Sequence, residues 1–275
     1  MAELVGIYAA SHGPMIVRKW DALTVACKDT ITSAFDELGR RINAARPDVL
    51  IVISPDHWVN FFLDNLPSIC VGVGDTHEGP PEPWLNAFPH KEMAGHAPLA
   101  QHIVERAFAR DFEPSVSYKL ALDHGFCIPL WKAGVDPLPA LVPVVLNTVE
   151  PPFPTVRRCF EWGAVLAEAI ASFAGNTRVA ILATGGLSHS IGEATMGAID
   201  EGFDRECLQF LASGERDALF EFLDKRMQAA GNGTAEVRNW LAAHGAAGAR
   251  GFDLIHYSAL PEVYVGCGFA SWKVE

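Results

Sequence analysis

Apolar residues in this chain form short unbroken runs that alternate with longer amphipathic segments, a pattern typical of strands buried in a sheet between covering helices. We expect strands at residues 3–10, 49–53, 61–63, 69–73, 114–120, 140–147, 178–184 and 263–274. We expect helices at 20–45, 96–109, 155–173, 200–212, 215–229 and 234–246, and a short one that ends at Lys132. This order predicts an α/β protein with a central mixed β-sheet flanked by helices, and residues 1–275 as a single domain.

Residues 74–95 interrupt this pattern, because they are rich in proline and show no clear period. Long loops inside compact domains are usually lids or interfaces, so we expect a loop over the mouth of a site. Its two histidines, His77 and His90, have no partner at metal-ligand spacing and are interpreted as surface residues. The other histidines away from predicted strand ends are interpreted as capping, structural or surface residues: His96, His102, His244 and His256.

Composition narrows the possible partners of the chain. The formal net charge is −12 and no basic run occurs, which argues against nucleic acid or an anionic membrane surface. No apolar run approaches the ~20 residues that a membrane helix needs, and the N-terminus does not resemble a signal peptide. We therefore expect an intracellular, cytoplasmic protein. The six cysteines lack C-x-x-C spacing, which predicts buried reduced thiols.

Histidines follow three of the predicted strands directly. These are His12, His57 and His189, and a fourth, His124, stands near the start of the short helix that ends at Lys132. In open α/β sheets, ligands bind just beyond the carboxyl ends of the strands. Four histidines at one such edge predict a functional site.

The chemistry of that site stays open on residue types alone. Two histidines and one carboxylate with open positions are typical of non-haem Fe(II) oxygenases. A hydrolytic zinc site uses similar ligands and needs a single water position, and sequence spacing does not separate the two. Further histidines beside the metal could move protons near neutral pH. Glu236 follows Thr234, a candidate N-cap, so its carboxylate could also simply stabilise the start of a helix.

Five short motifs occur in a fixed order along most of the chain. They are Ser11-His12-Gly13-Pro14, Pro55-Asp56-His57, Val71-Gly72-Val73-Gly74, Asp123-His124-Gly125 and Thr184-Gly185-Gly186-Leu187-Ser188-His189. Together they resemble the class III extradiol ring-cleavage dioxygenases, the LigB-type family that includes the catalytic subunit of protocatechuate 4,5-dioxygenase. The matching pieces run from residue 8 to residue 241, and the last two motifs in this order are the most specific.

The resemblance implies a role for each candidate residue. His12 and His57 match the two iron-binding histidines, and Glu236 matches the carboxylate ligand in a weaker motif. His189 matches the active-site base, and His124 the second acid/base histidine. The implied cofactor is Fe(II), and the implied reaction inserts both atoms of O2 into a catechol-type ring to give a muconic semialdehyde-type product.

Departures from the family pattern leave several points open. In the protocatechuate branch a small helical subunit closes the site, so we expect this chain to work as a homo-oligomer or with a separate small subunit. A carboxylate on the substrate ring would need an anchor, and Arg18, Lys119 and Thr148 are candidates. Asp56 and Asp123 are candidate partners of the neighbouring histidines. The alternatives are cleavage of 2-aminophenols, a zinc hydrolase, and a non-catalytic binding protein on the same fold.

Overall fold

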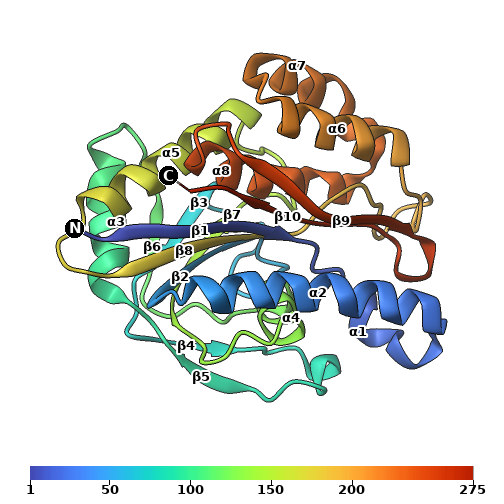
Figure 1. Ribbon diagram of the computed structural model, residues 1–275, viewed down its shortest axis with the longest axis horizontal. Helices are drawn as coiled ribbons and strands as arrows, with labels where there is room; N and C mark the ends of the chain where they lie inside the picture. Colours follow the sequence, from blue (N-terminus) through green and yellow to red (C-terminus); the bar gives the residue numbers. More distant parts are fainter. Residues whose placement is uncertain (275) are drawn as a thin grey trace.

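The computed structural model describes residues 1–274 and is organised around one eight-stranded sheet (Figure 1). Its strands are β1 (Glu3–Ala10), β2 (Val49–Ser54), β3 (Ile69–Gly72), β6 (Ser115–Ser117), β7 (Ala140–Leu146), β8 (Arg178–Thr184), β9 (Phe252–Leu260) and β10 (Val265–Trp272). They are hydrogen-bonded in the order β6-β3-β7-β2-β8-β1-β10-β9. The four central strands β7, β2, β8 and β1 are mutually parallel, so their carboxyl ends meet at one edge. Strands β3 and β10 pair antiparallel to this block, which makes the sheet mixed.

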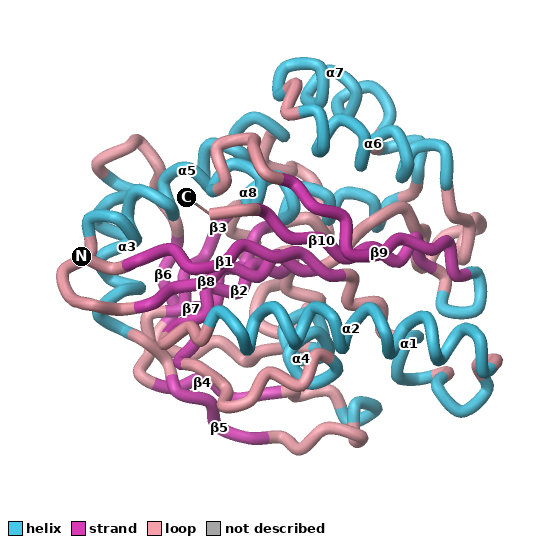
Figure 2. The backbone as a smooth tube through the Cα atoms, in the orientation of Figure 1, coloured by secondary structure: helices cyan, strands magenta, loops and turns pink. Residues whose placement is uncertain are grey.

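Each face of the sheet is covered by its own group of helices, as Figure 2 shows. One face packs against α3 (Ala97–Phe108), α5 (Val156–Ser172), α6 (Glu201–Ser213), α7 (Arg216–Arg226) and α8 (Val237–Ala246). The other packs against α2 (Val25–Ala45) and α4 (His124–Lys132). Side chains alternate between the two cores along β2: Val49, Ile51 and Ile53 enter the first, and Leu50 and Val52 the second. The predicted α/β class, with a mixed sheet between helices, is confirmed.

Three differences from the predicted elements concern two strands and the start of one helix. Residues 61–63 form no strand, since Phe62 makes only an isolated bridge to Asn65. Strand β9 was not expected, because it is an outer strand whose residues are mostly half-exposed and show no clean alternation. The long N-terminal helix was predicted to begin at residue 20. It begins at Val25, after a short 3-10 turn, Trp20–Ala22, and Thr24 accepts a hydrogen bond from the N–H of Cys27 as its N-cap.

The segment at 74–95 is not the plain loop that was expected. It contains an antiparallel pair, β4 (Thr76–Gly79) and β5 (Lys91–Ala94), with a short 3-10 turn, Pro83–Leu85, between them. The prediction of His77 as a surface residue is wrong, because alternation along β4 turns its side chain inward and leaves it 2% exposed. The reason is local: four-residue strands are too short to show a period in the sequence.

The entry into α8 also differs from the prediction. Thr234 is not its N-cap: it lies in a 3-10 turn, Asn232–Glu236, and its hydroxyl donates to the carbonyl of Ala230. Helix α8 begins at Val237, and the N-cap position is taken by Glu236, whose side chain makes no capping hydrogen bond. The carboxylate of Glu236 is therefore free to point elsewhere.

Several smaller predictions are confirmed. All six cysteines are free and buried, and His96 caps α3 by accepting a hydrogen bond from the N–H of Leu99. His244 is a buried structural residue that accepts a hydrogen bond from the indole of Trp272. Across residues 1–274, every helix is too short or too polar to cross a membrane.

Candidate active site

The parallel strands bring the histidines that follow them to one place. His12 follows β1, His57 follows β2 and His189 follows β8, and Glu236 reaches the same point from the start of α8. His12 Nε2 lies 3.3 Å from Glu236 Oε1, and His57 Nε2 lies 3.4 Å from the same oxygen. His189 Nε2 lies 3.8 Å from the other carboxylate oxygen. A single buried carboxylate is thus surrounded by three imidazoles.

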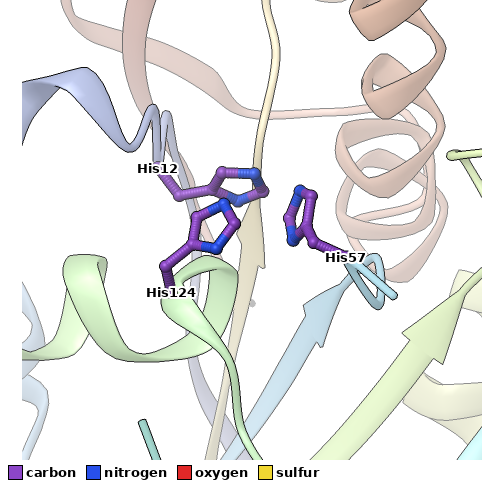
Figure 3. A group of neighbouring side chains, drawn as sticks. All are labelled: His12, His57 and His124. Carbon is purple, nitrogen blue, oxygen red and sulfur yellow. The ribbon is translucent and has the colours of Figure 1, made fainter. Parts of the chain in front are cut away.

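His124 joins this group as the first residue of α4. Its ring centroid lies 4.1 Å from that of His57 and 5.6 Å from that of His12. Figure 3 shows the three rings turned toward a shared space, and their ligand nitrogens lie within 4.8 Å of one another. The structure therefore brings together all five residues that the sequence singled out. His57 is the most exposed of them, with 21% of its side chain accessible, so the site opens beside it.

In each strand-end histidine, Nδ1, the ring nitrogen that does not face Glu236, has a hydrogen-bond partner. His12 Nδ1 lies 3.0 Å from Thr184 Oγ1, and His57 Nδ1 lies 3.0 Å from Asp123 Oδ2. Such outer partners fix the tautomer and the orientation of a metal-binding imidazole, which leaves Nε2 to bind the ion. Asp123 is thus a histidine partner, as expected, but it pairs with His57 and not with its chain neighbour His124, whose Nδ1 lies against Glu82. Asp56 is not a histidine partner, because it accepts the N–H groups of the following turn at residues 59–61.

Glu236 is held by the glycine turn that follows β8. Its Oε2 accepts a hydrogen bond from the N–H of Gly186 at 2.7 Å. A Cβ added at Gly185 would lie 2.6 Å from the same oxygen, and Gly185 has a φ of +100°, so only glycine fits there. The indole of Trp240, one turn along α8, donates to the carbonyl of Gly185 and ties the helix to the turn.

Opposite charges shift the pKa values of these buried groups. Burial raises the pKa of Glu236, but His12 and His189 outweigh it and hold that pKa well below its ordinary value. Burial disfavours the charged form of His57 and so lowers its pKa. Asp123 and Glu236 outweigh this effect and raise the pKa to about 10. Burial and the charge of His57 both lower the pKa of His124. Ionised carboxylates between imidazoles provide the environment in which a divalent cation can replace protons.

Sequence reasoning missed two residues of the site. Glu82 Oε1 accepts hydrogen bonds from the backbone N–H of His124 at 2.9 Å and from its Nδ1 at 2.7 Å. The ring of Trp84 lies 5.4 Å from the ring of His124. Both residues belong to the segment at 74–95, which therefore covers one side of the site, as expected. Nothing in their local sequence marks them, because only the packing of the β4–β5 pair against the site brings them to His124.

A buried hydrogen-bond network fixes the position of the loop that carries His189. Its Nδ1 donates to the carbonyl of Leu187 at 2.9 Å, which leaves Nε2 as the free nitrogen that faces the site. The N–H and the hydroxyl of Ser188 both donate to Asp204, at 2.8 and 2.9 Å. Tyr257 OH donates to the same carboxylate at 2.7 Å. Asp204 has no accessible surface, so the loop that carries His189 is tied to the interior.

Residues 6–268 match the family described as the catalytic LigB subunit of aromatic ring-opening dioxygenase. The chain belongs to this family. A 2,3-dihydroxyphenylpropionate/2,3-dihydroxicinnamic acid 1,2-dioxygenase of Paraburkholderia phymatum is 27% identical to this LigB-type chain, with 83% of this chain and 85% of the relative covered. The enzyme of the same name from Klebsiella pneumoniae is 32% identical over 66% of this chain and 56% of the relative.

A solved structure supports the fold independently. An uncharacterized protein, JW3007 from Escherichia coli K12, superposes with a TM-score of 0.65 at 17% identity, with 97% of this chain and all of that chain covered. Membership of the LigB family makes the protein an aromatic ring-opening dioxygenase, with a catechol-type substrate and O2 as the family's reactants. The zinc hydrolase and the non-catalytic binding protein are thereby disfavoured.

Proposed function

We propose that this LigB-family protein is a non-haem Fe(II) extradiol dioxygenase. It would insert both atoms of O2 into a catechol-type ring, of the protocatechuate or gallate kind or a substituted catechol, and give a muconic semialdehyde-type product. One observation carries the proposal: Glu236 Oε1 lies within 3.4 Å of the Nε2 atoms of both His12 and His57. The Nδ1 atoms of both histidines are engaged on the outside.

The donor set fits the ion that the family implies. His12, His57 and Glu236 would hold Fe(II) through two imidazole nitrogens and one carboxylate, the ligand set of non-haem oxygenases with open positions. The chemistry that a ferrous ion supplies in such a site is activation of dioxygen next to a catechol whose hydroxyl pKa it lowers.

Two histidines would move protons. His189 donates its Nδ1 hydrogen to Leu187, so its Nε2 is the atom that accepts a proton from a catechol hydroxyl. His124 has its Nδ1 held by Glu82 and would deliver a proton during the oxygen-insertion stage. Glu82 and Asp123 are positioning residues, because they act through His124 and His57.

Anaerobic reconstitution tests the proposal. The protein is loaded with Fe(II), mixed with a panel of catechols and 2-aminophenol, and exposed to oxygen. We expect oxygen uptake equimolar with the ring and the yellow absorbance of a semialdehyde. His12→Ala should abolish iron binding, and His90→Ala, which alters an exposed histidine outside the site, should not. Iron binding that survives His12→Ala unchanged would refute the ligand set.

A second variant separates the proton-transfer role from the ligand role, because a lost base should stop turnover while iron stays bound. His189→Ala should retain the ion and lose turnover. If the variant instead loses iron and stays active when iron is in excess, the assignment of His189 as the base rather than as a metal ligand is wrong. Light scattering on the same samples tests the predicted homo-oligomer, and recovery of activity on adding a small partner chain would support the two-subunit form.

A further inference from the structure

We propose that Arg18 and Trp84 form a subsite for a carboxylate on the side group of the substrate. The inference rests on the proposed function, since it requires a catechol bound beside His12 and His57. Arg18 ends the short helix α1 (Met15–Arg18), which begins three residues after His12. Figure 1 shows α1 beyond the carboxyl end of β1, and His12 lies in the connection between them.

A row of planar groups connects Arg18 to the site. The guanidinium carbon of Arg18 lies 5.5 Å from the centroid of the Trp84 ring. The Trp84 ring in turn lies 5.4 Å from the ring of His124, and His124 lies 4.1 Å from His57, ring centroid to ring centroid. Trp84 is half-buried and Arg18 is exposed, so the row leads outward from the buried site to solvent. A flat aromatic substrate has a matching surface along this path.

Within residues 1–274, the N–H donors of Arg18 have no hydrogen-bond acceptor. Across residues 1–274, its guanidinium has neither a carboxylate within 4.0 Å nor a hydrogen-bond acceptor, and its stack on Trp84 is its one side-chain interaction. Two other arginines that lie over aromatic rings are different. Arg157 pairs with Asp217 at 3.8 Å, and Arg205 with Glu201 at 3.2 Å. Arg18 therefore keeps a fixed, planar fork of N–H donors available for a carboxylate.

The net charge of the chain gives the unpaired guanidinium of Arg18 a use in binding an anionic substrate. With a formal net charge of −12, the protein repels an anionic substrate at long range. Arg18 and Lys19 are adjacent cations, and Lys19 Nζ lies 3.7 Å from the ring of Tyr264, so Arg18 alone of the two contacts Trp84. The nearby carboxylates of Glu82 and Asp123 are engaged with histidines. The positive charge at this position is thus not neutralised by either.

The other candidate anchors lack such a connection. Lys119 is exposed, and among residues 1–274 its side chain makes no ion pair, hydrogen bond or ring contact with a site residue. Thr148 is buried, and its hydroxyl has no hydrogen-bond partner in the part of the chain that the structure describes. Of the three candidates, Arg18 alone contacts a ring that itself lies against a site histidine. We therefore assign the anchoring of the substrate carboxylate to Arg18.

The decisive experiment compares two substrates that differ only in charge, 3-(2,3-dihydroxyphenyl)propionate and its neutral amide. Arg18→Met should lower kcat/KM for the acid roughly 10- to 100-fold, mainly through KM, as expected for a lost charge-assisted hydrogen bond. The amide should change less than about 2-fold, because it makes no charge-assisted bond. Arg18→Lys should lie between wild type and Arg18→Met for the acid. Arg157→Met, which removes a stacked arginine on α5, is the matched control and should leave both substrates unchanged.

The outcomes separate this inference from the proposed function. Equal losses on acid and amide would show that Arg18 acts on the fold of α1, and no loss on either would show that the subsite lies elsewhere. Both results overturn the inference and leave ring cleavage intact. If wild-type enzyme cleaves neither compound nor any neutral catechol, the proposed function fails instead. Calorimetric binding of 3-phenylpropionate to the metal-free protein gives a second measure, and wild type should bind it more tightly than Arg18→Met.

Discussion

Asp123 Oδ2 accepts two hydrogen bonds from one residue, the backbone N–H of His57 at 2.7 Å and the ring Nδ1 of His57 at 3.0 Å. Because Asp123 also precedes His124 and caps α4 through the N–H of Gly125, one carboxylate sets the positions of two site histidines. Its pKa is held below the ordinary range by His57, against the effect of burial, so it is ionised at neutral pH.

Asp123→Asn should weaken metal binding roughly 10- to 100-fold, the usual effect of removing the outer partner of a ligating histidine. The amide cannot provide the negative charge that fixes His57 with Nε2 toward Glu236. Competition with a chelating dye measures the affinity. Asp253→Asn, which alters only an exposed pair with Arg41, serves as the control. Unchanged affinity in Asp123→Asn would mean that His57 is not a ligand.

Gly185→Ala should remove most metal affinity while the fold persists. A Cβ at this position meets Glu236 Oε2 at 2.6 Å, so the carboxylate must move. The variant also places alanine at a φ of +100°, which adds backbone strain. Gly192→Ala separates the two effects, because Gly192 has a φ of +71° and nothing within 4 Å of an added Cβ. Metal titration should show a loss for Gly185→Ala alone; equal affinities would count against Glu236 as a ligand.

Glu82→Gln should impair turnover and leave metal binding intact. The carboxylate raises the pKa of His124, against burial and the charge of His57, so its neutralisation lowers that pKa further. If His124 donates a proton, the alkaline decline of kcat should move to lower pH, because the acid form is lost sooner as pH rises. A pH profile of kcat checks this. Glu78→Gln, at an exposed position on β4 in the same 74–95 segment, is the control and should leave the profile unchanged.

The strand-end histidines could be predicted because their signal is local. An apolar run followed within five residues by His12, His57 or His189 marks a strand end, and parallel pairing brings such ends together. Glu236 was recognised through family resemblance, since its own segment resembles an ordinary helix start. The structure shows what fixes its position, because the glycine turn after β8 donates a hydrogen bond to its carboxylate.

The parts that sequence did not reveal depend on contacts between distant segments. Glu82 and His124 are 42 residues apart, and they meet only because the β4–β5 pair folds back over α4. The outer strand β9 has neither a continuous apolar run nor a clean alternation, since it is half-exposed. Asp204 is a charged residue in an amphipathic helix, and its burial follows from partners on the β8 loop and on β9.

Tyr257→Phe tests whether the Asp204 network positions His189. Removing the hydroxyl deletes one of the donors to Asp204 and leaves the Ser188 contacts in place. We expect kcat to fall roughly 3- to 10-fold, the size of one lost hydrogen bond of about 1 kcal/mol, with KM and metal affinity unchanged. Tyr118→Phe, at an exposed tyrosine, is the control. A fall in metal affinity of the same size would show a general loosening of the site rather than a displaced base.

Because of His244, the metal-free protein should become less stable as the pH is lowered from 6.5 toward 4. Burial lowers its pKa from 6.5 to about 4, so above pH 6.5 the residue is neutral in both states and its contribution is complete. As pH falls from 6.5 toward 4, the unfolded chain takes up a proton that the folded chain refuses, and about 3 kcal/mol of stability is lost. His244→Asn keeps an acceptor for the Trp272 indole without the titration. Urea unfolding between pH 4 and 7.5 should give a flatter curve for the variant than for wild type, and parallel curves would show that His244 does not titrate on unfolding.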